Sequence, residues 1–247
     1  MNRDRGQSDL VYGRNSVLEC LRAGRRRAQA LHLLAGGEDL DEIREAARGV
    51  TLIETSRGEL DRLAKGGVHQ GVVLEADPLP LYDLKTWLAK PIAKDAVVVL
   101  LDGVTDPHNL GAIARSAAAM GGAALVLLED RAAPLTPTAI KAASGAMEHI
   151  DLVRVTNLAR AIGQLKEHEF WIAALDPEGD KTLWEADLGG RIGLVIGSEG
   201  SGLRRLVRES CDFGVRIPLT GPIPSLNASV SAAIALAECL RRRQPAK

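Results

Sequence analysis

Three separate stretches of the sequence place polar side chains among glycines and alanines, where a ligand could be held. The first, from Leu101 to Gly122, ends an apolar run and continues into a helical pattern, with Asn109 at the expected N-cap. Inside this pattern Arg115 has only glycine and alanine three and four positions away, so no carboxylate of its own helix can pair with it. Its guanidinium therefore reaches solvent, pairs with another part of the fold, or binds a substrate phosphate.

The second stretch, Gly193 to Arg205, carries a carboxylate on a glycine-rich loop. An apolar strand pattern runs into Gly197-Ser198-Glu199-Gly200-Ser201-Gly202, and a helical pattern follows. Glycines permit positive φ angles and a close approach of the backbone to a ligand. The order G-x-x-G-x-G differs from the dinucleotide-binding G-x-G-x-x-G, and no G-x-x-x-x-G-K phosphate loop is present. The pattern indicates either a ligand site or a tight turn that leaves Glu199 near a helix start.

The third stretch, Arg216 to Glu238, joins a strand pattern to a long helical pattern through a loop rich in proline and glycine. Ser225 and Asn227 stand where the helix begins, and both residue types are favoured N-caps. They therefore have a structural explanation as well as a functional one. The prolines favour the functional one, because a rigid loop at a strand end positions ligands well.

The elements that must position these stretches alternate along the chain. Strand patterns cover residues 30–34, 50–53, 72–74, 96–101, 124–128, 152–155, 170–174, 192–196 and 213–217. Helical patterns cover residues 15–21, 40–47, 59–64, 110–120, 138–143, 158–166, 203–209 and 227–241. Apolar strands alternating with helices predict an α/β fold with a parallel sheet covered on both faces. Such sheets bind ligands at the carboxyl ends of their strands, where all three polar stretches lie.

A proline-rich segment divides the chain into two parts. Pro78, Pro80 and Pro91 interrupt regular structure between strand patterns on either side. This predicts an N-terminal domain over residues 1–76, a linker over 77–95 with a short helix near residues 84–88, and a C-terminal domain over 96–247.

The composition excludes several classes of protein. The 247 residues are 46% apolar and 26% charged, with a net charge of −1, as in an ordinary globular chain. The apolar runs are far shorter than the roughly 20 residues of a membrane helix, and no signal-peptide pattern opens the chain. We therefore expect a cytoplasmic protein without a membrane partner. Three distant cysteines and five histidines without helical pairing predict neither a disulfide framework nor a metal site.

Taken together, the three stretches resemble the sequence motifs of the SpoU/TrmH family, the RNA ribose 2′-O-methyltransferases of the SPOUT class. The matching residues are Asn109 with Arg115, Gly197-Ser198-Glu199-Gly200 with Gly202-Leu203, and Ile217-Pro218 with Ser225-Leu226-Asn227. Residues 13–17 and His69-Gln70-Gly71 resemble the segments that open and close the family's N-terminal domain. Residues 101–112 and 154–160 are most similar to the branch that methylates a guanosine in the P loop of bacterial 23S rRNA. The loop over residues 220–224 is richer in proline than the family pattern, which leaves its backbone path open.

The resemblance implies a fold, a cofactor and partners. It implies that residues 1–76 form an RNA-binding domain similar to the ribosomal L30e/L7Ae proteins. It implies that residues 96–247 form an α/β domain with a deep trefoil knot at the cofactor site. S-adenosylmethionine is the implied methyl donor, with no metal, 23S rRNA the implied substrate, and a homodimer through the C-terminal domain the implied assembly.

The resemblance also assigns roles to residues. The cofactor pocket is expected to be lined by Gly197, Ile217, Leu219 and Leu226. The catalytic residues expected around the reacting ribose are Asn109, Arg115, Glu199, Ser225 and Asn227. Arg115 is a poor general base, because the pKa of a guanidinium exceeds about 12. We therefore expect Arg115 to orient an RNA phosphate or the 2′-oxygen while Glu199 holds it, within one chain or across a dimer.

The charge of the N-terminal region is distributed unevenly. Residues 1–33 carry a net charge of +4 and residues 34–64 a net charge of −4. This indicates either a polarised, phosphate-binding face or a solvated helix face beside a basic turn. With RNA as the partner, the residues expected to contact phosphates are Arg14, Arg22, Arg25, Arg26 and Arg27. Because aromatic residues are only 3% of the chain, recognition is expected to use shape and backbone rather than stacking platforms.

The sequence leaves three other functions open. A nicotinamide-dependent oxidoreductase would suit the alternating strands, but the fingerprint loop and its acidic partner are absent. A non-catalytic RNA-binding or ribosome assembly factor could share the fold. A tRNA ribose methyltransferase is the remaining alternative, and the additional N-terminal domain favours rRNA by analogy.

Overall fold

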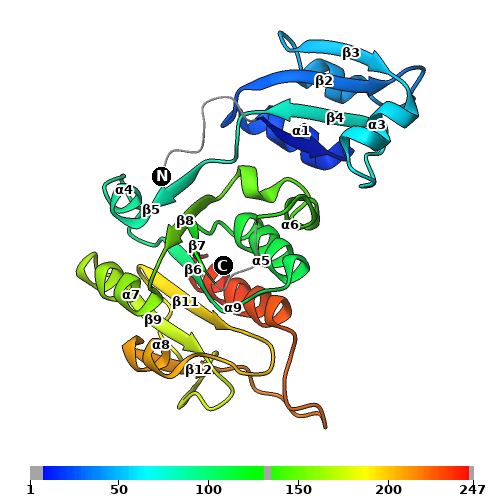
Figure 1. Cartoon of the computed structure of the whole chain (residues 1–247). Coiled ribbons are helices and arrows are strands. Elements are labelled where there is room, and N and C mark those ends of the chain that lie inside the picture. The colour runs from blue at the N-terminus through cyan, green and yellow to red at the C-terminus, as the bar shows by residue number, and fades with distance from the viewer. Residues whose placement is uncertain (1–7, 131–134, 245–247) are drawn as a thin grey trace.

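The computed structural model describes residues 8–130 and 135–244, which form two units with one sheet each (Figure 1). The first sheet has the strand order β1-β4-β2-β3 and the second the order β10-β12-β9-β11-β6-β7-β8-β5. In the part of the chain that the structure describes, no helix combines the length and the apolarity needed to span a bilayer.

The first unit is a small α/β unit whose strands are covered on both faces. Its elements are β1 (Asp9–Tyr12), α1 (Arg14–Ala23), β2 (Ala28–Leu34), α2 (Asp41–Ala46), β3 (Thr51–Thr55), α3 (Arg57–Leu63) and β4 (Val72–Ala76). Strand β4 pairs antiparallel with β1 and β2, whereas β2 and β3 are parallel. The buried side chains of α1 and α2 pack on one face of the sheet and Leu60 of α3 on the other.

The contacts at the start of α1 give Gly13 and the segment His69-Gln70-Gly71 a structural role. Gly13 stands at the N-cap with φ 91° and offers no side chain to the helix. Instead, Gln70 accepts a hydrogen bond from the backbone N–H of Arg14 through Oε1, at 3.0 Å. Gln70 adopts φ 54°, and His69 accepts a bond from the N–H of Gly71 at 3.0 Å. The segment before β4 thus supplies the cap that α1 lacks.

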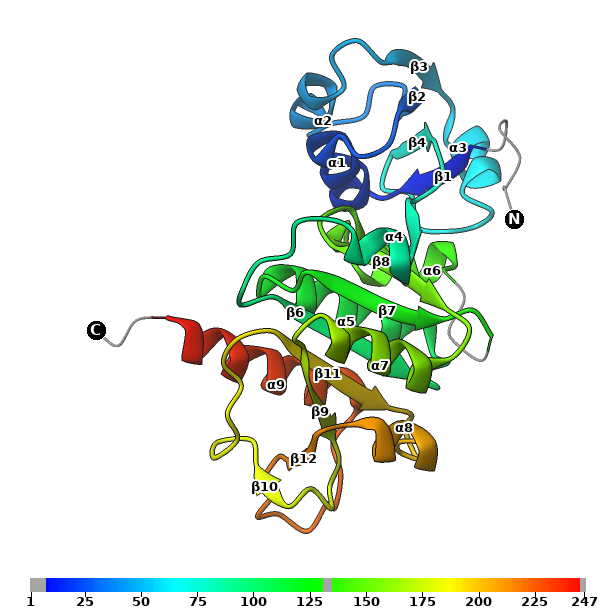
Figure 2. The same cartoon turned by 90° about the vertical axis from the view of Figure 1, so that its left-hand side faces the viewer.

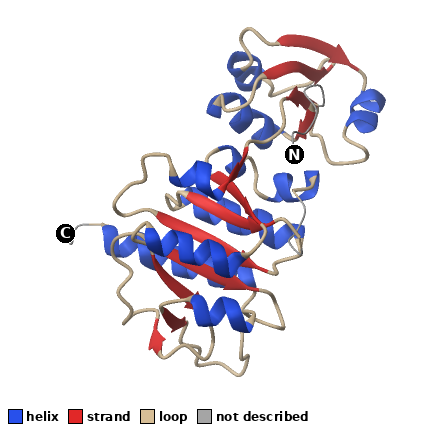
Figure 3. Cartoon of the chain, turned by 60° about the vertical axis from the view of Figure 1, so that its left-hand side comes forward, coloured by secondary structure: helices blue, strands red, loops and turns tan. Residues whose placement is uncertain are grey.

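The second unit is built on eight parallel strands, with helices on both faces of the sheet (Figure 3). Its first half comprises β5 (Leu81–Asp83), α4 (Leu84–Leu88), β6 (Val97–Asp102), α5 (Pro107–Ala119), β7 (Ala124–Leu128), α6 (Pro137–Ala142), the 3₁₀ helix η1 (Ala146–Glu148) and β8 (Asp151–Val155). Its second half comprises α7 (Leu158–Glu167), β9 (Trp171–Leu175), β10 (Lys181–Thr182), β11 (Ile192–Gly197), α8 (Arg205–Ser210), β12 (Phe213–Arg216) and α9 (Ala228–Arg243). Side chains of α5, α6 and α9 pack on one face, and those of α4, α7 and α8 on the other.

The order in which the chain adds strands to this sheet changes side at its centre. From β6 the chain continues to β7 on one side, and from β11 it continues to β12 on the other. Strands β6 and β11 are nevertheless neighbours, and their last residues, Asp102 and Gly197, are register partners. The loops that follow them diverge, and open α/β sheets bind ligands at such a position. We call the region between these two loops the crevice.

Residues 217–227 bring the chain back from β12 to this crevice. The helix that follows, α9, packs against α5 and β11, and the views from two sides agree on this placement (Figures 1 and 2). This return is the part of the fold where the resemblance predicts the knot. On its other side α5 packs closely against α6, because a Cβ added to Gly111 would lie 2.4 Å from Cβ of Ala142.

Two local predictions need correction. The segment over residues 77–95 contains the predicted helix, α4, but also β5, which pairs with β8. It is therefore the edge of the second sheet rather than only a linker, since an edge strand tolerates nearby prolines. The helix after β6 begins earlier than predicted. Asp106, not Asn109, is its N-cap, and Asp106 accepts a bond from the N–H of His108 at 2.9 Å.

Candidate functional site

Three of the predicted catalytic residues meet at the crevice between β6 and β11. Glu199 accepts hydrogen bonds through Oε1 from Nδ2 of Asn109 at 3.0 Å and from Nδ2 of Asn227. The same oxygen accepts a bond from the backbone N–H of Ala228 at 3.3 Å. Nδ2 of Asn227 also donates to Oδ1 of Asn109 at 2.9 Å. We call Asn109, Glu199 and Asn227 the polar triad.

The position of each member follows from its element. Asn109 lies in the first turn of α5 and is buried. Because Asp106 occupies the N-cap position, the side chain of Asn109 is free to face the crevice. Asn227 is the N-cap of α9, and its Oδ1 accepts bonds from the N–H groups of Ser229 and Val230 at 2.9 and 3.3 Å. This fixes the amide so that Nδ2 faces Glu199. The Glu199 carboxylate in turn lies at the positive end of the α9 dipole.

The loop that carries Glu199 is held by its own backbone and by a buried carboxylate. Ser198 and Gly202 form an antiparallel bridge, with N–H to O distances of 3.2 and 3.1 Å. Asp102, which is 1% exposed, accepts bonds from the N–H and Nε of Arg204 at 2.8 and 2.6 Å. Sequence reasoning missed Asp102, although a lone carboxylate that ends an apolar run is a recognisable signal.

Gly197 allows this loop to fold back on its strand. A Cβ at this position would lie 2.5 Å from the backbone carbon of Gly202 and 2.8 Å from the N of Leu203. Both contacts are to backbone, so an alanine here must displace the loop.

Substituting Gly197→Ala is therefore expected to weaken S-adenosylmethionine binding by about 1–3 kcal/mol, or about 5- to 150-fold. Isothermal titration calorimetry measures this directly. Gly163→Ala is the matched control, because no atom lies within 4 Å of a Cβ at Gly163 in helix α7. It should bind the cofactor normally and be slightly stabilised. Equal affinities of the two variants would contradict the role given to Gly197.

The other residues predicted to line the cofactor pocket lie on the return segment. Ile217 is half-buried, whereas Leu219 and Leu226 are 41% and 36% exposed. Ser225, predicted to be catalytic, is exposed on the same loop. Accessible apolar side chains and backbone groups suit an adenosyl group, which is recognised by apolar surface and by backbone N–H and C=O groups. The donor set of the crevice therefore fits S-adenosylmethionine.

Arg115 does not join the polar triad within one chain. It is exposed on α5, and Nη1 donates to Oγ of Ser144 at 3.3 Å. Among residues 8–130 and 135–244, the donors to Glu199 are Asn109, Asn227 and Ala228. The expectation that Glu199 holds Arg115 is thus not met within one chain, and the alternative across a dimer stays a proposal.

Two of the arginines predicted to contact phosphate lie instead at the interface between the two units, which we call the seam. The side chain of Arg26 is 0% exposed and forms a two-bond ion pair with Glu148, whose side chain is 2% exposed. Arg25 donates to the carbonyl of Ile150 at 3.0 Å and pairs with Asp151. The prediction for Arg25 and Arg26 is therefore wrong in this structure, because carboxylates more than 120 residues away occupy both guanidiniums.

The other three arginines remain at the surface. Arg14 donates to the backbone carbonyls of Gln70 and Glu38 at 3.3 and 2.8 Å, and Arg22 pairs with Glu19 and Glu42. Exposed pairs of this kind are weak and exchange readily for a phosphate. Arg27 is exposed, and among the described residues no ion pair of its side chain is found.

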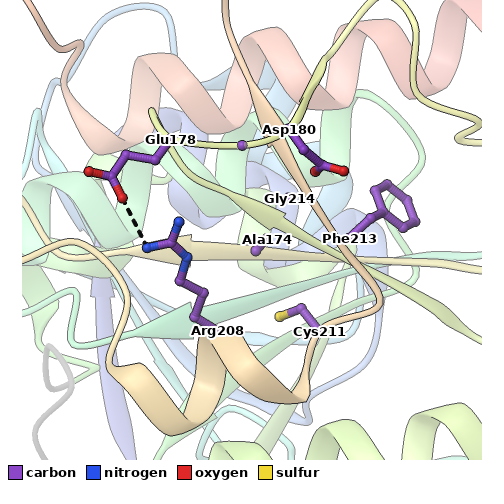
Figure 4. A pocket seen from close by; sticks show the side chains of 8 residues that line it. Ala174, Glu178, Asp180, Arg208, Cys211, Phe213 and Gly214 are labelled. Atoms are coloured by element: carbon purple, nitrogen blue, oxygen red, sulfur yellow. Dashed lines mark hydrogen bonds and ion pairs between the residues drawn. The ribbon is translucent and has the colours of Figure 1, made fainter.

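Two cavities lie away from the polar triad. One, of about 260 Å³, is lined by Ala174, Phe213 and Gly214 on the sheet and by Arg208 and Cys211 of the α8 segment (Figure 4). The arginine in its lining is paired, because Arg208 bonds Glu178 at 3.2 Å and Asp176 at 3.0 Å. Burial raises the pKa of the Cys211 thiol to about 12, so this cysteine is not a nucleophile at neutral pH. The second cavity, of about 320 Å³, contains Arg115.

The side chains that could bind a metal lie scattered over the described residues. Among them, no group of three or more histidine, cysteine, aspartate or glutamate side chains is placed to hold a metal ion. Burial raises the pKa of the thiols of Cys20 and Cys239 to about 11, which keeps both protonated at neutral pH.

Sequence comparison matches both units to known families and proteins. The model of the SpoU rRNA Methylase family matches residues 96–237, and the model for RNA 2′-O ribose methyltransferase substrate binding matches residues 10–82. The 23S rRNA (guanosine-2′-O-)-methyltransferase RlmB of Escherichia coli is 42% identical over 246 residues, which cover 96% of this chain and 99% of that protein. A tRNA/rRNA methyltransferase of Mycolicibacterium vanbaalenii, described as uncharacterized, is 43% identical over 97% of this chain and 78% of that protein.

Structural comparison extends over both units as well. The SpoU methyltransferase AviRb from Streptomyces viridochromogenes, in complex with the cofactor AdoMet, superposes with a TM-score of 0.82 at 27% identity, covering 98% of this chain and 94% of that one. An RNA 2′-O ribose methyltransferase superposes with a TM-score of 0.81 at 28% identity, covering 98% and 91%. The predicted fold class, a parallel α/β domain preceded by a smaller α/β unit, is confirmed.

Proposed function

The chain belongs to the SpoU rRNA methylase family, and from that premise we propose that it transfers the methyl group of S-adenosylmethionine to the ribose 2′-oxygen of a guanosine in 23S rRNA. The observation that carries the proposal is the convergence of Asn109, Glu199 and Asn227 at the carboxyl ends of β6 and β11. A guanosine of the P loop is the proposed nucleotide.

The residues of the crevice have two tasks in such a reaction. S-adenosylmethionine, when bound, supplies a methyl carbon already activated by its sulfonium. The chain must align the ribose hydroxyl with that carbon, which contributes up to about 7–11 kcal/mol, and must remove the hydroxyl proton. Gly197, Ile217, Leu219 and Leu226 are the proposed cofactor contacts.

Glu199 is the proposed acceptor of the hydroxyl proton. Its Oε1 receives all three hydrogen bonds that the described residues make to this carboxylate. Its Oε2 is thereby left to face the ribose hydroxyl. Asn109 and Asn227 hold the carboxylate in place, and the exposed Ser225 of the same loop is proposed to contact the ribose. A carboxylate suits the role better than Arg115, whose guanidinium stays protonated.

The two units divide the work in this proposal. Residues 1–76 bind the RNA, with Arg27, Arg14 and Arg22 as candidate phosphate contacts, and residues 96–247 carry the methyl transfer. Ile223, shortly before α9, and Val230, in its first turn, expose apolar side chains. We propose that this surface forms a homodimer through the C-terminal domain, and that the enzyme acts in the cytoplasm on ribosomal RNA.

The test is an incubation of the protein with methyl-labelled S-adenosylmethionine and separate pools of unmodified 23S rRNA, 16S rRNA and tRNA. We expect label in 23S rRNA only, mapped to a guanosine whose 2′-oxygen resists alkaline cleavage. Label in tRNA alone would favour a tRNA ribose methyltransferase. An absence of label in all three pools would favour a non-catalytic RNA-binding factor.

A further inference from the structure

Asp102 carries a buried carboxylate that the proposed reaction does not use. Its side chain is 0% exposed, and it is the last residue of β6, the strand that leads through residues 103–106 into the helix of Asn109. A carboxylate at this depth costs free energy unless charged or polar partners compensate it. The partners of Asp102 therefore show what it holds in place.

Among the described residues, the partners of the Asp102 carboxylate all belong to Arg204. Oδ2 accepts a hydrogen bond from the backbone N–H of Arg204 at 2.8 Å, and Oδ1 accepts one from its Nε at 2.6 Å. Nη2 of the same guanidinium lies 2.6 Å from Oδ1. One carboxylate thus binds both the backbone and the side chain of Arg204, which fixes the position of the chain at this residue as well as the direction of its side chain.

Arg204 stands at the end of the loop that carries Glu199. The start of this loop, residues 198–203, is fixed by the pairing of β11 with β6, in which Gly197 is the register partner of Asp102. The end of the loop is fixed by the bonds between Arg204 and Asp102. The same residue of β6 therefore anchors both ends of the loop, and Glu199 lies between them.

This anchor connects two members of the polar triad that come from different loops. Asn109 follows the loop after β6, whereas Glu199 lies in the loop after β11, and Nδ2 of Asn109 donates to Oε1 of Glu199 at 3.0 Å. A shift of one loop against the other would break this bond and turn the carboxylate. A displacement of about 1 Å at a reacting group can lower a rate about 100-fold.

We propose that Asp102 is a positioning residue for methyl transfer, which acts through Arg204 to hold the loop of Glu199 in register with Asn109. This proposal rests on the proposed function, in which Glu199 accepts the proton of the ribose hydroxyl. Asp102 itself does not reach the ribose or the cofactor, because its side chain is inaccessible. Its effect on the rate therefore depends on the carboxylate of Glu199 being present.

The experiment is a double-mutant cycle on the single-turnover rate of 23S rRNA methylation. Saturating S-adenosylmethionine removes any change of cofactor affinity from the measured rate. Asp102→Asn keeps the shape of the side chain and removes its charge, and it should lower the rate about 10- to 100-fold. In a chain that already carries Glu199→Gln, the same substitution should lower the remaining rate less than about threefold, because residues that act as a unit are not additive. Equal losses in both chains would overturn the proposal, since a general structural defect is additive.

Two variants of Arg204 test the pair from its other side. Arg204→Lys keeps a cation and the backbone N–H for Asp102, and it should retain the rate within about fivefold. Arg204→Ala leaves Asp102 with the backbone N–H alone, and it should repeat the loss seen in Asp102→Asn. A lysine variant as slow as the alanine variant would contradict the role given to the pair. Because Arg204 is 46% exposed, these substitutions alter the surface end of the pair and leave the buried residue in place.

Asp212→Asn is the matched control, because Asp212 has the same kinds of partner away from the site. Its Oδ2 accepts a bond from the backbone N–H of Ile172 at 2.8 Å, and its Oδ1 pairs with Nζ of Lys166 at 2.8 Å. Ile172 lies near the amino end of β9, at the edge of the sheet opposite the polar triad. This variant should methylate within about twofold of the wild-type rate. A loss as large as that of Asp102→Asn would overturn the proposal.

A failure of the proposed function is distinguishable from a failure of this inference. If the proposed function is wrong, the wild-type chain leaves 23S rRNA unlabelled. If only the role of Asp102 is wrong, the wild-type chain labels 23S rRNA and the double-mutant cycle is additive.

Discussion

Replacing Glu199 by glutamine is expected to lower the turnover number about 10²- to 10⁴-fold, the contribution typical of a positioned general base. Glutamine has the same shape, and its amide oxygen can still accept the bonds of Asn109, Asn227 and the Ala228 N–H. The crevice should therefore keep its geometry and lose only the group that accepts the hydroxyl proton. Single-turnover methylation of 23S rRNA at saturating S-adenosylmethionine measures the loss.

Glu209→Gln is the control for this prediction. Glu209 lies on α8, shortly after the glycine-rich loop, and its one ion pair among the described residues is with the exposed Arg205, at 3.1 Å. This variant should methylate at the wild-type rate. Cofactor affinity should change little in either variant, because neither substitution alters the residues proposed to line the cofactor pocket. A turnover number of Glu199→Gln within threefold of wild type would exclude Glu199 as the proton acceptor.

Replacing Glu148 by glutamine is expected to destabilise the protein by about 3–5 kcal/mol, because it removes the close counter-charge of the buried Arg26 and leaves the longer pair with Asp9, at 3.7 Å. Both side chains are essentially inaccessible, at 2% and 0% exposure. For a chain of this length the melting temperature should fall by about 6–20 °C. Differential scanning calorimetry measures the change and also reveals whether the two units then melt separately.

Two further variants isolate the buried pair as the cause. Glu45→Gln removes one partner of the exposed Arg48–Glu45 pair, whose side chains are 81% and 71% exposed, and should change stability by less than about 0.5 kcal/mol. Arg26→Met combined with Glu148→Met replaces both charges by apolar groups and should recover most of the stability lost. A loss below about 1 kcal/mol in Glu148→Gln would show that the seam does not depend on this pair.

Most of the secondary structure was predictable, because its signals are local. The helix of residues 158–166 and the strand of residues 192–196 appear almost at their predicted bounds, since each has a clear apolar period. The missed strands β1, β5 and β10 are all edge strands, of four, three and two residues. Segments so short carry too little periodicity to distinguish a strand from a loop.

Local signals were less reliable where two nearby residues could each cap the same helix. Asp106 and Asn109 are both competent N-caps, and the residue type alone does not say which one begins the helix. Pro107, favoured at the first helical position, is the signal that points to Asp106. Once Asp106 takes the cap, Asn109 faces the crevice and joins the polar triad. Assigning the N-cap to the wrong residue therefore changes the role expected of Asn109.

The amino-acid sequence by itself determined which residue types could form the site and that they stand at strand ends. Only the tertiary structure decided which of them meet. Asn109 reaches Glu199 across 90 residues and Asn227 across 118, whereas Arg115, on the same helix as Asn109, lines the separate cavity of about 320 Å³. Arg26 was predicted to contact phosphate and is buried against Glu148, 122 residues away. Contacts over such separations depend on strand order and on how the two units dock, and no local pattern of residues encodes either.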